Sequence, residues 1–238
     1  MHNNLGNVYR ELGELDAALK SYKKAIAIKP DFVEAFFNQG ITFQAQNQLD
    51  SAVKSYEEVI SIKPDYAEAH NNLGTIFAEL KQFKNAEETF KQAILLNPKY
   101  AGAHYNLGNT LKDLRKIYEA EESFRKAIVI NPNYTEAHNN LGNIMKSHDR
   151  LEDAEASYRK AIAINPDYAE AHNNLGNIMK SHDRLEDAEA SYRKAIAIKP
   201  DYAPAYSNLG ANLKNLGKFE EAEANCRKAI ILDQKFTQ

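Results

Sequence analysis

Apolar and small residues recur along the chain at spacings of three and four, in two stripes that return many times. Offsets of three and four describe one face of an α-helix, so each pair of stripes predicts two amphipathic helices packed against each other. In residues 169–202 the stripes are Ala171, His172, Leu175, Gly176 and Met179, followed by Leu185, Ala188, Tyr192, Ala195 and Ile196.

The pattern returns every 34 residues, because prolines from Pro30 to Pro200 and glycines from Gly6 to Gly210 keep this period. Seven registers account for 7 × 34 = 238 residues, the length of the chain. A fixed period of this size is typical of repeat architectures. We therefore expect one all-α solenoid without a linker or second domain. Its predicted repeats are 1–32, 33–66, 67–100, 101–134, 135–168, 169–202 and 203–236.

Numbering each repeat so that its glycine stands at position 8 makes the columns comparable. Position 20 is always Ala and position 28 always Ile, while position 24 is aromatic except for Cys226 in the last repeat. Position 4 is His in five repeats, and Gln234 stands where the last repeat lacks its proline. Small residues at positions 8, 20 and 27 would let the two helices approach closely. Repeats 135–168 and 169–202 differ at only two positions, which indicates a duplication or a deliberate construction.

These Leu-Gly, Tyr, Ala, aromatic and Pro landmarks resemble the tetratricopeptide repeat, position by position over the whole chain. The resemblance implies a right-handed superhelical solenoid of helix-turn-helix repeats that binds other proteins. The string from His138 to Asn143 is similar to repeats in the superhelical array of O-GlcNAc transferase. No trace of a catalytic domain accompanies it, so the resemblance implies only the binding part of such a glycosyltransferase.

The starts of several first helices carry an acidic pair. Asp31 is followed three residues later by Glu34, and Asp65 and Asp167 are followed in the same way by glutamates. This spacing predicts capping boxes, in which the Asp side chain accepts from the first helical turn. The proline just before each pair is expected to end the preceding helix.

Position 6 is Asn in all seven repeats, and we call this set the asparagine column. Asn is unfavourable inside a helix by roughly half a kcal/mol relative to Ala, so helix propensity does not explain it. One amide can bond both a backbone N–H and a backbone C=O of an extended peptide. The alternatives are a hydrogen bond between neighbouring helices, or descent from one copied repeat. The resemblance implies a ladder lining a concave surface that grips peptides. The column is Asn4, Asn38, Asn72, Asn106, Asn140, Asn174 and Asn208.

The residues beside the asparagine column vary along the chain. Phe37 and Ile41 predict an apolar pocket for a ligand side chain, although packing of Phe37 against the next helix is equally open. Tyr105 lies further along the same face. A lysine column at position 12 would favour acidic ligand residues. The remaining polar candidates are Asn139, Asn143, Asn173 and Asn177, and the lysine column is Lys112, Lys146, Lys180 and Lys214.

Composition narrows the classes of function. With 30 basic and 33 acidic residues the net charge is −3, which argues against a dedicated nucleic-acid surface. No stretch approaches the roughly 18 apolar residues of a membrane span. The single Cys226 excludes a disulfide framework, fits a reducing compartment such as the cytoplasm, and is expected to be partly buried.

Catalytic chemistry is not expected. No phosphate loop, nucleophile elbow or paired-Cys motif is present. The position-4 histidines are 34 residues apart, so packing explains them better than a shared metal. Ion pairs such as Glu155 with Arg159 are read as a solvated face. We therefore expect no enzyme, no catalytic residue, no metal and no cofactor.

Three functions remain. The first is a scaffold that binds extended peptides through the asparagine column. The second is a structural or self-assembling spacer without a peptide ligand, and the third, disfavoured by the charge, is an RNA-binding helical-repeat array. Solenoids normally carry polar caps. The apolar edge expected at Cys226, Ala229 and Ile230 therefore predicts a segment of a longer protein and end-to-end self-association.

Overall fold

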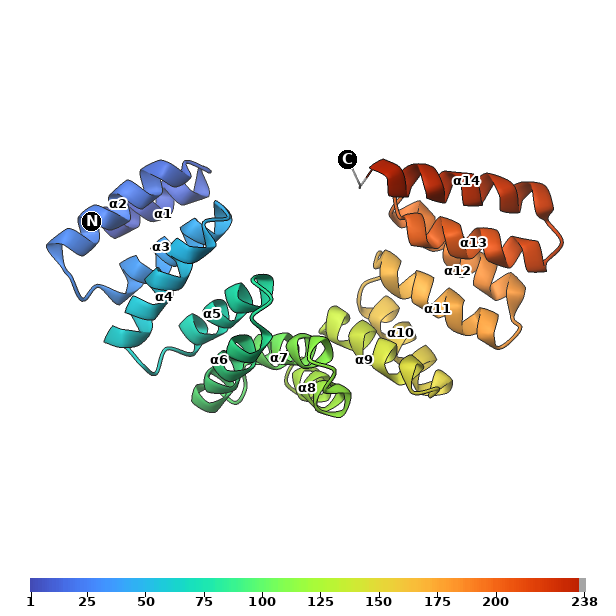
Figure 1. Cartoon of the computed structure of the whole chain (residues 1–238), viewed down its shortest axis with the longest axis horizontal. Helices are drawn as coiled ribbons and strands as arrows, with labels where there is room; N and C mark the ends of the chain where they lie inside the picture. The colour runs from blue at the N-terminus through green and yellow to red at the C-terminus, as the bar shows by residue number, and fades with distance from the viewer. Residues whose placement is uncertain (236–238) are drawn as a thin grey trace. The chain divides into compact units, whose positions relative to one another are not determined.

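The structure is a computed structural model that describes residues 1–235, with side chains as far as Asp233. The described residues form fourteen α-helices and no strand (Figure 1). The predicted last repeat ends one residue beyond this range, and the side chain of Gln234 also lies outside it. The helices are α1 (His2–Glu11), α2 (Leu15–Ile28), α3 (Val33–Ala45), α4 (Leu49–Ile62), α5 (Ala67–Glu79), α6 (Phe83–Leu96), α7 (Ala101–Asp113), α8 (Ile117–Ile130), α9 (Thr135–Ser147), α10 (Leu151–Ile164), α11 (Ala169–Ser181), α12 (Leu185–Ile198), α13 (Ala203–Asn215) and α14 (Phe219–Lys235).

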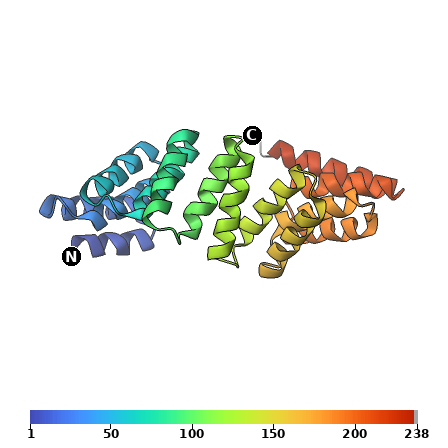
Figure 2. The same ribbon diagram turned by 90° about the horizontal axis from the view of Figure 1, so that it is seen from below.

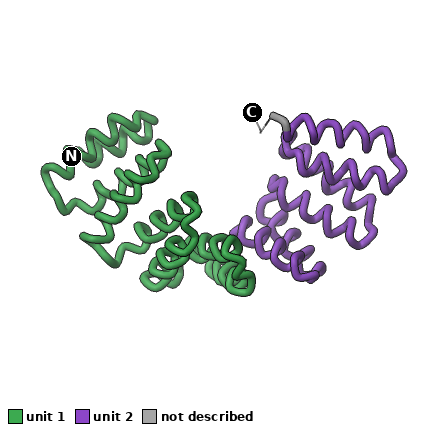
Figure 3. The backbone as a smooth tube through the Cα atoms, viewed as in Figure 1, with its two compact units in different colours: residues 1–130 green, residues 131–238 purple. Residues whose placement is uncertain are grey.

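Each repeat folds into two helices, an odd-numbered first helix and an even-numbered second helix. The predicted all-α solenoid of helix-turn-helix repeats is therefore confirmed. The chain divides into two compact units, Met1–Ile130 and Asn131–Gln238 (Figure 3). The expectation of one continuous solenoid domain stays a prediction.

Within each unit consecutive helices pack against one another along the chain (Figure 2). The second helix of one repeat packs on the first helix of the next, and first helices such as α9, α11 and α13 also touch their neighbours. We call the surface of the odd-numbered helices the first-helix face and that of the even-numbered helices the second-helix face.

The core consists of small residues that allow close approach and large residues that use the space. Alanines at positions 3 and 20 and the aromatic at position 24 are fully buried in the inner repeats, as Ala103, Ala120 and Phe124 show. A Cβ on Gly108 would lie 2.7 Å from Cε1 of Phe124, so this glycine leaves room for the ring. The glycine at position 8 thus packs directly against the aromatic ring at position 24.

Position 10 is a core column that the sequence stripes omitted. Its residues are at most 3% exposed from repeat two to repeat seven, although three of the six are polar: Thr42, Ile76, Thr110, Ile144, Ile178 and Asn212. Thr42 Oγ1 donates within its own helix to the backbone oxygen of Asn38 at 2.7 Å. Asn212 Nδ2 donates to the backbone oxygen of Leu185, 27 residues earlier, at 2.8 Å, while its buried Oδ1 accepts no hydrogen bond from the described residues. Because three of these residues are polar, the hydrophobic pattern of the sequence did not identify position 10 as buried.

The predicted capping boxes are wrong. The N-cap residues of α3, α5 and α11 are Phe32, Tyr66 and Tyr168, and none makes a side-chain cap hydrogen bond. The aspartates stand one residue too early, because the turn between repeats places the aromatic at the N-cap. In that turn the Phe32 N–H donates to the backbone oxygen of Lys29 at 3.1 Å.

Candidate functional site

The amide nitrogen of the asparagine column links neighbouring repeats. Where the preceding repeat has Asn at position 5, the side-chain amide of the position-6 Asn donates from Nδ2 to Oδ1 of that position-5 Asn. The acceptors are buried, with exposed fractions between 4% and 8%. Each pair thus bonds two first helices to each other. The pairs are Asn38 to Asn3 at 3.1 Å, Asn106 to Asn71 at 3.1 Å, Asn174 to Asn139 at 3.0 Å and Asn208 to Asn173 at 2.9 Å.

Position 5 was therefore misread as free surface. Asn139 and Asn173 were expected to form part of a polar strip beside the column, but they are the buried acceptors of its amide groups. The sequence signal that could have found this is the adjacent Asn-Asn pair, present in four repeats. Where Phe37 replaces the acceptor, Asn72 Nδ2 donates instead to the Tyr56 hydroxyl at 3.3 Å.

The amide oxygens of part of the column remain available. Within the described residues, Oδ1 of Asn106, Asn174 and Asn208 accepts no hydrogen bond, and all three side chains are half-buried. Asn38 Oδ1 instead receives Arg10 Nη1 at 3.4 Å. Asn72 Oδ1 receives Asn71 Nδ2 at 3.4 Å, Asn140 also has a partner, and Asn4 is exposed.

Position 9 supplies the complementary donors in the second unit. Tyr158 donates its hydroxyl to Asn143 Oδ1 at 2.8 Å, and Tyr192 to Asn177 Oδ1 at 2.9 Å. Burial raises the pKa of both tyrosines, so their hydroxyls stay protonated and keep donating. With the oxygens occupied, Nδ2 of Asn143 and Asn177 is left without a partner in the described part of the chain.

The lysine column lies on the same face, and its ammonium groups form no ion pair with the described residues. Lys112 belongs to the first unit, and Lys146, Lys180 and Lys214 belong to the second. Lys180 is half-buried, the others are exposed, and none has an ion-pair partner among the described residues. The first-helix face of the second unit therefore combines unpaired amide oxygens, unpaired amide nitrogens and free cationic groups.

The apolar candidates contact the core. The Phe37 ring stacks on Tyr66 with centroids 5.0 Å apart and meets the edge of Tyr56 at 5.7 Å. Ile41 packs against the same buried cluster. The Tyr105 ring lies 5.8 Å from Phe124. The packing alternative for Phe37 is thus present in the structure, and ligand contact by these residues stays a prediction.

Comparison with known proteins identifies the family. The family model described as the Cilia and flagella-associated protein 70 C-terminal domain matches residues 33–235, and a TPR repeat model matches residues 6–47. The chain belongs to this family of tetratricopeptide-repeat domains. Proteins built from such repeats are generally non-catalytic scaffolds with protein or peptide partners. No match is found among curated proteins.

Solved tetratricopeptide structures share the fold. MamA is 28% identical, with 69% of this chain and 96% of the MamA chain covered and a TM-score of 0.61. PilF from Pseudomonas aeruginosa is 19% identical, covering 86% of this chain and 93% of its own, with a TM-score of 0.77. YrrB is 24% identical over 77% of this chain and 95% of its own, with a TM-score of 0.63.

The position-4 histidines hold the turns between tetratricopeptide repeats. A ring nitrogen of His70 lies 3.0 Å from the backbone oxygen of Pro64, six residues earlier. The Tyr206 hydroxyl donates to the Pro200 oxygen at 3.2 Å from the same position. His104, His138 and His172 make the same contact at 3.0–3.1 Å. Among residues that the structure describes, no group of three or more His, Cys, Asp or Glu side chains could hold a metal ion.

The last helix of the tetratricopeptide chain, α14, is more exposed than the sequence predicted. Cys226 was expected to be partly buried but is exposed, because no following first helix covers this part of α14 within the described residues. Ile230 is 58% exposed beside it, while Ala229 is buried. None of the described helices has the length and apolar content needed to cross a lipid bilayer. End-to-end self-association stays a prediction.

Carboxylates at position 21 join consecutive tetratricopeptide repeats, which corrects their reading as a solvated face. Glu87 lies 2.6 Å from Lys91 Nζ in its own helix and 2.7 Å from Lys116 Nζ in the next repeat. Glu155 bonds both Arg159 and Arg184 in the same way, and Glu189 bonds Arg193 and Lys218. Burial raises the pKa of Glu87, but hydrogen bonds from Lys116 and Lys91 outweigh it and leave the pKa lowered.

These carboxylates predict an acid-sensitive fold. Because the folded-state pKa of Glu87 is lowered from 4.5, ionisation stabilises the fold above that value, and this stabilisation is lost as the pH falls through the lowered pKa. We expect the melting temperature to fall between about pH 5 and about pH 3. Glu87→Gln should have a lower melting temperature at neutral pH and a smaller drop in acid. An equal drop in both proteins would show that Glu87 does not contribute.

Proposed function

We propose that this tetratricopeptide chain is a non-catalytic scaffold that binds an extended segment of a partner protein along the first-helix face of its second unit. The supporting observation is the pattern of unpaired amide groups. Asn174 and Asn208 offer oxygens that accept from backbone N–H groups, while Asn143 and Asn177 offer nitrogens that donate to backbone C=O groups. A peptide main chain supplies both.

The spacing of the repeats suits an extended ligand. Packed helices lie roughly 8–10 Å apart, whereas an extended chain advances roughly 3.3 Å per residue. One repeat therefore corresponds to two or three ligand residues. With about 1 kcal/mol net for each hydrogen bond and the entropic cost of association, we expect micromolar or weaker affinity.

The lysine column gives the proposed face a preference among peptides. Lys146, Lys180 and Lys214 are free to approach acidic ligand side chains. Binding through exposed charges weakens as salt is added, since the screening length falls to about 8 Å at physiological ionic strength. We therefore expect acidic segments to bind best at low salt. A peptide-binding role also fits YrrB, which is described as a TPR protein with an unusual peptide-binding site.

A matched pair of variants tests the role of the amide oxygens. Asn208→Ala and Asn173→Ala remove the same hydrogen bond of 2.9 Å between repeats, but only Asn208→Ala removes the available oxygen. Both should lose about 1 kcal/mol of unfolding free energy. Random short peptides would be selected on the wild-type protein, and the best acidic one titrated by calorimetry. We expect Asn208→Ala to weaken its binding about fivefold and Asn173→Ala to leave it nearly unchanged.

The competing function is a structural spacer. In its favour, four amide nitrogens of the asparagine column are already bonded to the preceding repeat. If the wild-type protein selects no acidic peptide, or both variants bind alike, the amide groups serve only to join repeats. An RNA-binding array is disfavoured by the net charge of −3, and the lysine column is the one feature that supports it.

A further inference from the structure

Three hollows of the described surface lie on the second-helix face, away from the asparagine column. Three pockets of about 290, 670 and 410 Å³ occupy equivalent places in repeats one and two, two and three, and five and six. The floor of each pocket comes from positions 4 and 7 of a first helix. Position 25 of the second helix in the preceding repeat lines one side, and positions 22 and 26 of the second helix in the same repeat line the other. The solenoid therefore repeats one groove, and its lining changes from repeat to repeat.

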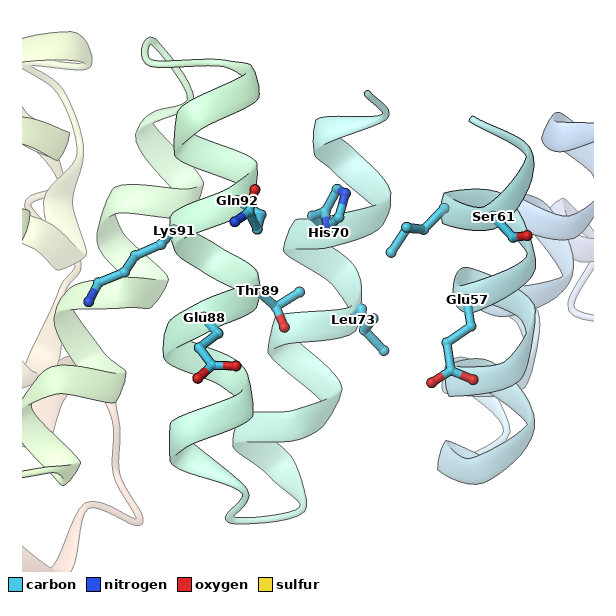
Figure 4. A pocket seen from close by; sticks show the side chains of 9 residues that line it. Glu57, Ser61, His70, Leu73, Glu88, Thr89, Lys91 and Gln92 are labelled. Carbon is cyan, nitrogen blue, oxygen red and sulfur yellow. The ribbon is translucent and has the colours of Figure 1, made fainter. Parts of the chain in front are cut away.

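The largest of these three pockets lies in the first unit between α4, α5 and α6, and we call it the repeat 2–3 groove (Figure 4). Its apolar lining includes Ile60 of α4 and Leu73 of α5. Leu73 is 7% exposed and Ile60 is half-buried, so the groove reaches down to the core. His70 also lines it, with a ring nitrogen already engaged by the backbone oxygen of Pro64. A volume of about 670 Å³ is within the usual range of ligand pockets.

Two carboxylates flank this groove from opposite sides. Figure 4 shows Glu57 on α4 and Glu88 on α6, with the apolar lining between these helices. Both glutamates are exposed, and neither has an ion-pair partner among the described residues. Lys91 also lines the groove, but its ammonium group extends away from it and pairs with Glu87 at 2.6 Å. The groove thus combines an apolar lining with unneutralised negative charge.

The equivalent grooves carry different charges at the same two positions. The pocket of repeats one and two has Lys23 and Lys54 in place of Glu57 and Glu88. The pocket of repeats five and six has Arg159 and Ala190 there. Since all three share one backbone arrangement, the acidic pair is a feature of the repeat 2–3 groove and not of the fold. Among these pockets it alone suits a basic ligand.

We propose that the repeat 2–3 groove docks a short basic segment of a partner protein, with a Lys or Arg beside a large apolar residue. The apolar side chain would pack on Ile60 and Leu73, where its burial supplies roughly 25 cal/mol per Å². The cation would lie between Glu57 and Glu88. Complementary charge chiefly supplies selectivity and faster association, and apolar burial supplies the affinity. This surface is separate from the first-helix face and prefers ligands of the opposite charge.

A tryptophan introduced at an exposed lining position tests the proposal, because its side chain fills the groove without replacing a buried residue. Ser61 is an exposed lining residue of the repeat 2–3 groove, and Ala163 is its counterpart in the groove of repeats five and six. Random short peptides displayed on phage would be selected on the wild-type protein, and the most enriched basic-apolar peptide synthesised and titrated. We expect Ser61→Trp to weaken this peptide more than tenfold and Ala163→Trp to leave it unchanged, with both variants keeping the wild-type circular dichroism spectrum.

A second variant tests the charges. Glu57→Gln combined with Glu88→Gln should weaken the basic-apolar peptide about tenfold, because the ligand's cation loses its attraction to both carboxylates. The proposal is overturned if no basic-apolar peptide is enriched, if binding survives Ser61→Trp, or if the wild type forms dimers that Ser61→Trp abolishes. Asn208→Ala should not change the affinity of the basic-apolar peptide. A negative result for the repeat 2–3 groove can therefore be told apart from a negative result for acidic peptides on the first-helix face.

Discussion

Replacing Phe90 by alanine is expected to lower the unfolding free energy of the first unit by about 3–5 kcal/mol. The Phe90 side chain is fully buried in α6, and its ring occupies the space above Gly74. Removing the ring leaves a cavity between two helices that cannot collapse, because Ala86 and Ala93 on either side are also fully buried. Denaturant unfolding would measure the loss, and hydrogen exchange should place it in α5 and α6.

Leu95→Ala is the matched control, since it also truncates a large apolar residue of α6. Leu95 is 72% exposed, so we expect a change within about 0.5 kcal/mol. A Phe90→Ala protein as stable as Leu95→Ala would contradict the close packing of position 24 against position 8. Because each repeat contacts mainly its neighbours, the second unit should keep its hydrogen-exchange protection in both variants.

Replacing Gly108 by alanine is expected to destabilise the first unit by about 1–3 kcal/mol, although alanine favours helix. A Cβ there would lie 2.7 Å from Cε1 and 2.8 Å from Cδ1 of Phe124. Phe124 is fully buried, so its ring has no free space to move into. The strain should exceed the gain of roughly 1 kcal/mol in helix propensity. The difference would appear in thermal and denaturant unfolding.

Gly102→Ala tests the same substitution in the same helix, α7. The nearest side-chain atom to its added Cβ is Cε2 of Tyr100 at 3.3 Å, and Tyr100 is only half-buried. Here the helix propensity should prevail, leaving the stability unchanged or slightly raised. If both glycines tolerate alanine equally, the approach of Phe124 would not explain the glycines at position 8.

The identity of the site residues was only partly predictable. The sequence identified the asparagine column, but the partners of its amide nitrogens lie 35 residues earlier in the chain, as Asn208 and Asn173 show. Which face of α11 meets α13 depends on the angle between repeats, and no local pattern encodes it. The same holds for Glu87 and Lys116, which lie 29 residues apart. The repeat 2–3 groove was missed because its residues come from three helices and include no distinctive motif.

By itself, the sequence determined the 34-residue period, the two helices of each repeat and most of the buried columns. These follow from the pitch of the α-helix, which turns a linear pattern into an apolar face. Only the tertiary structure decided that Asn173 is buried, that Cys226 is exposed and that Tyr66 stands at a helix start. The reason is that burial and hydrogen bonding of these residues depend on the neighbouring repeat, and local periodicity does not specify how repeats meet.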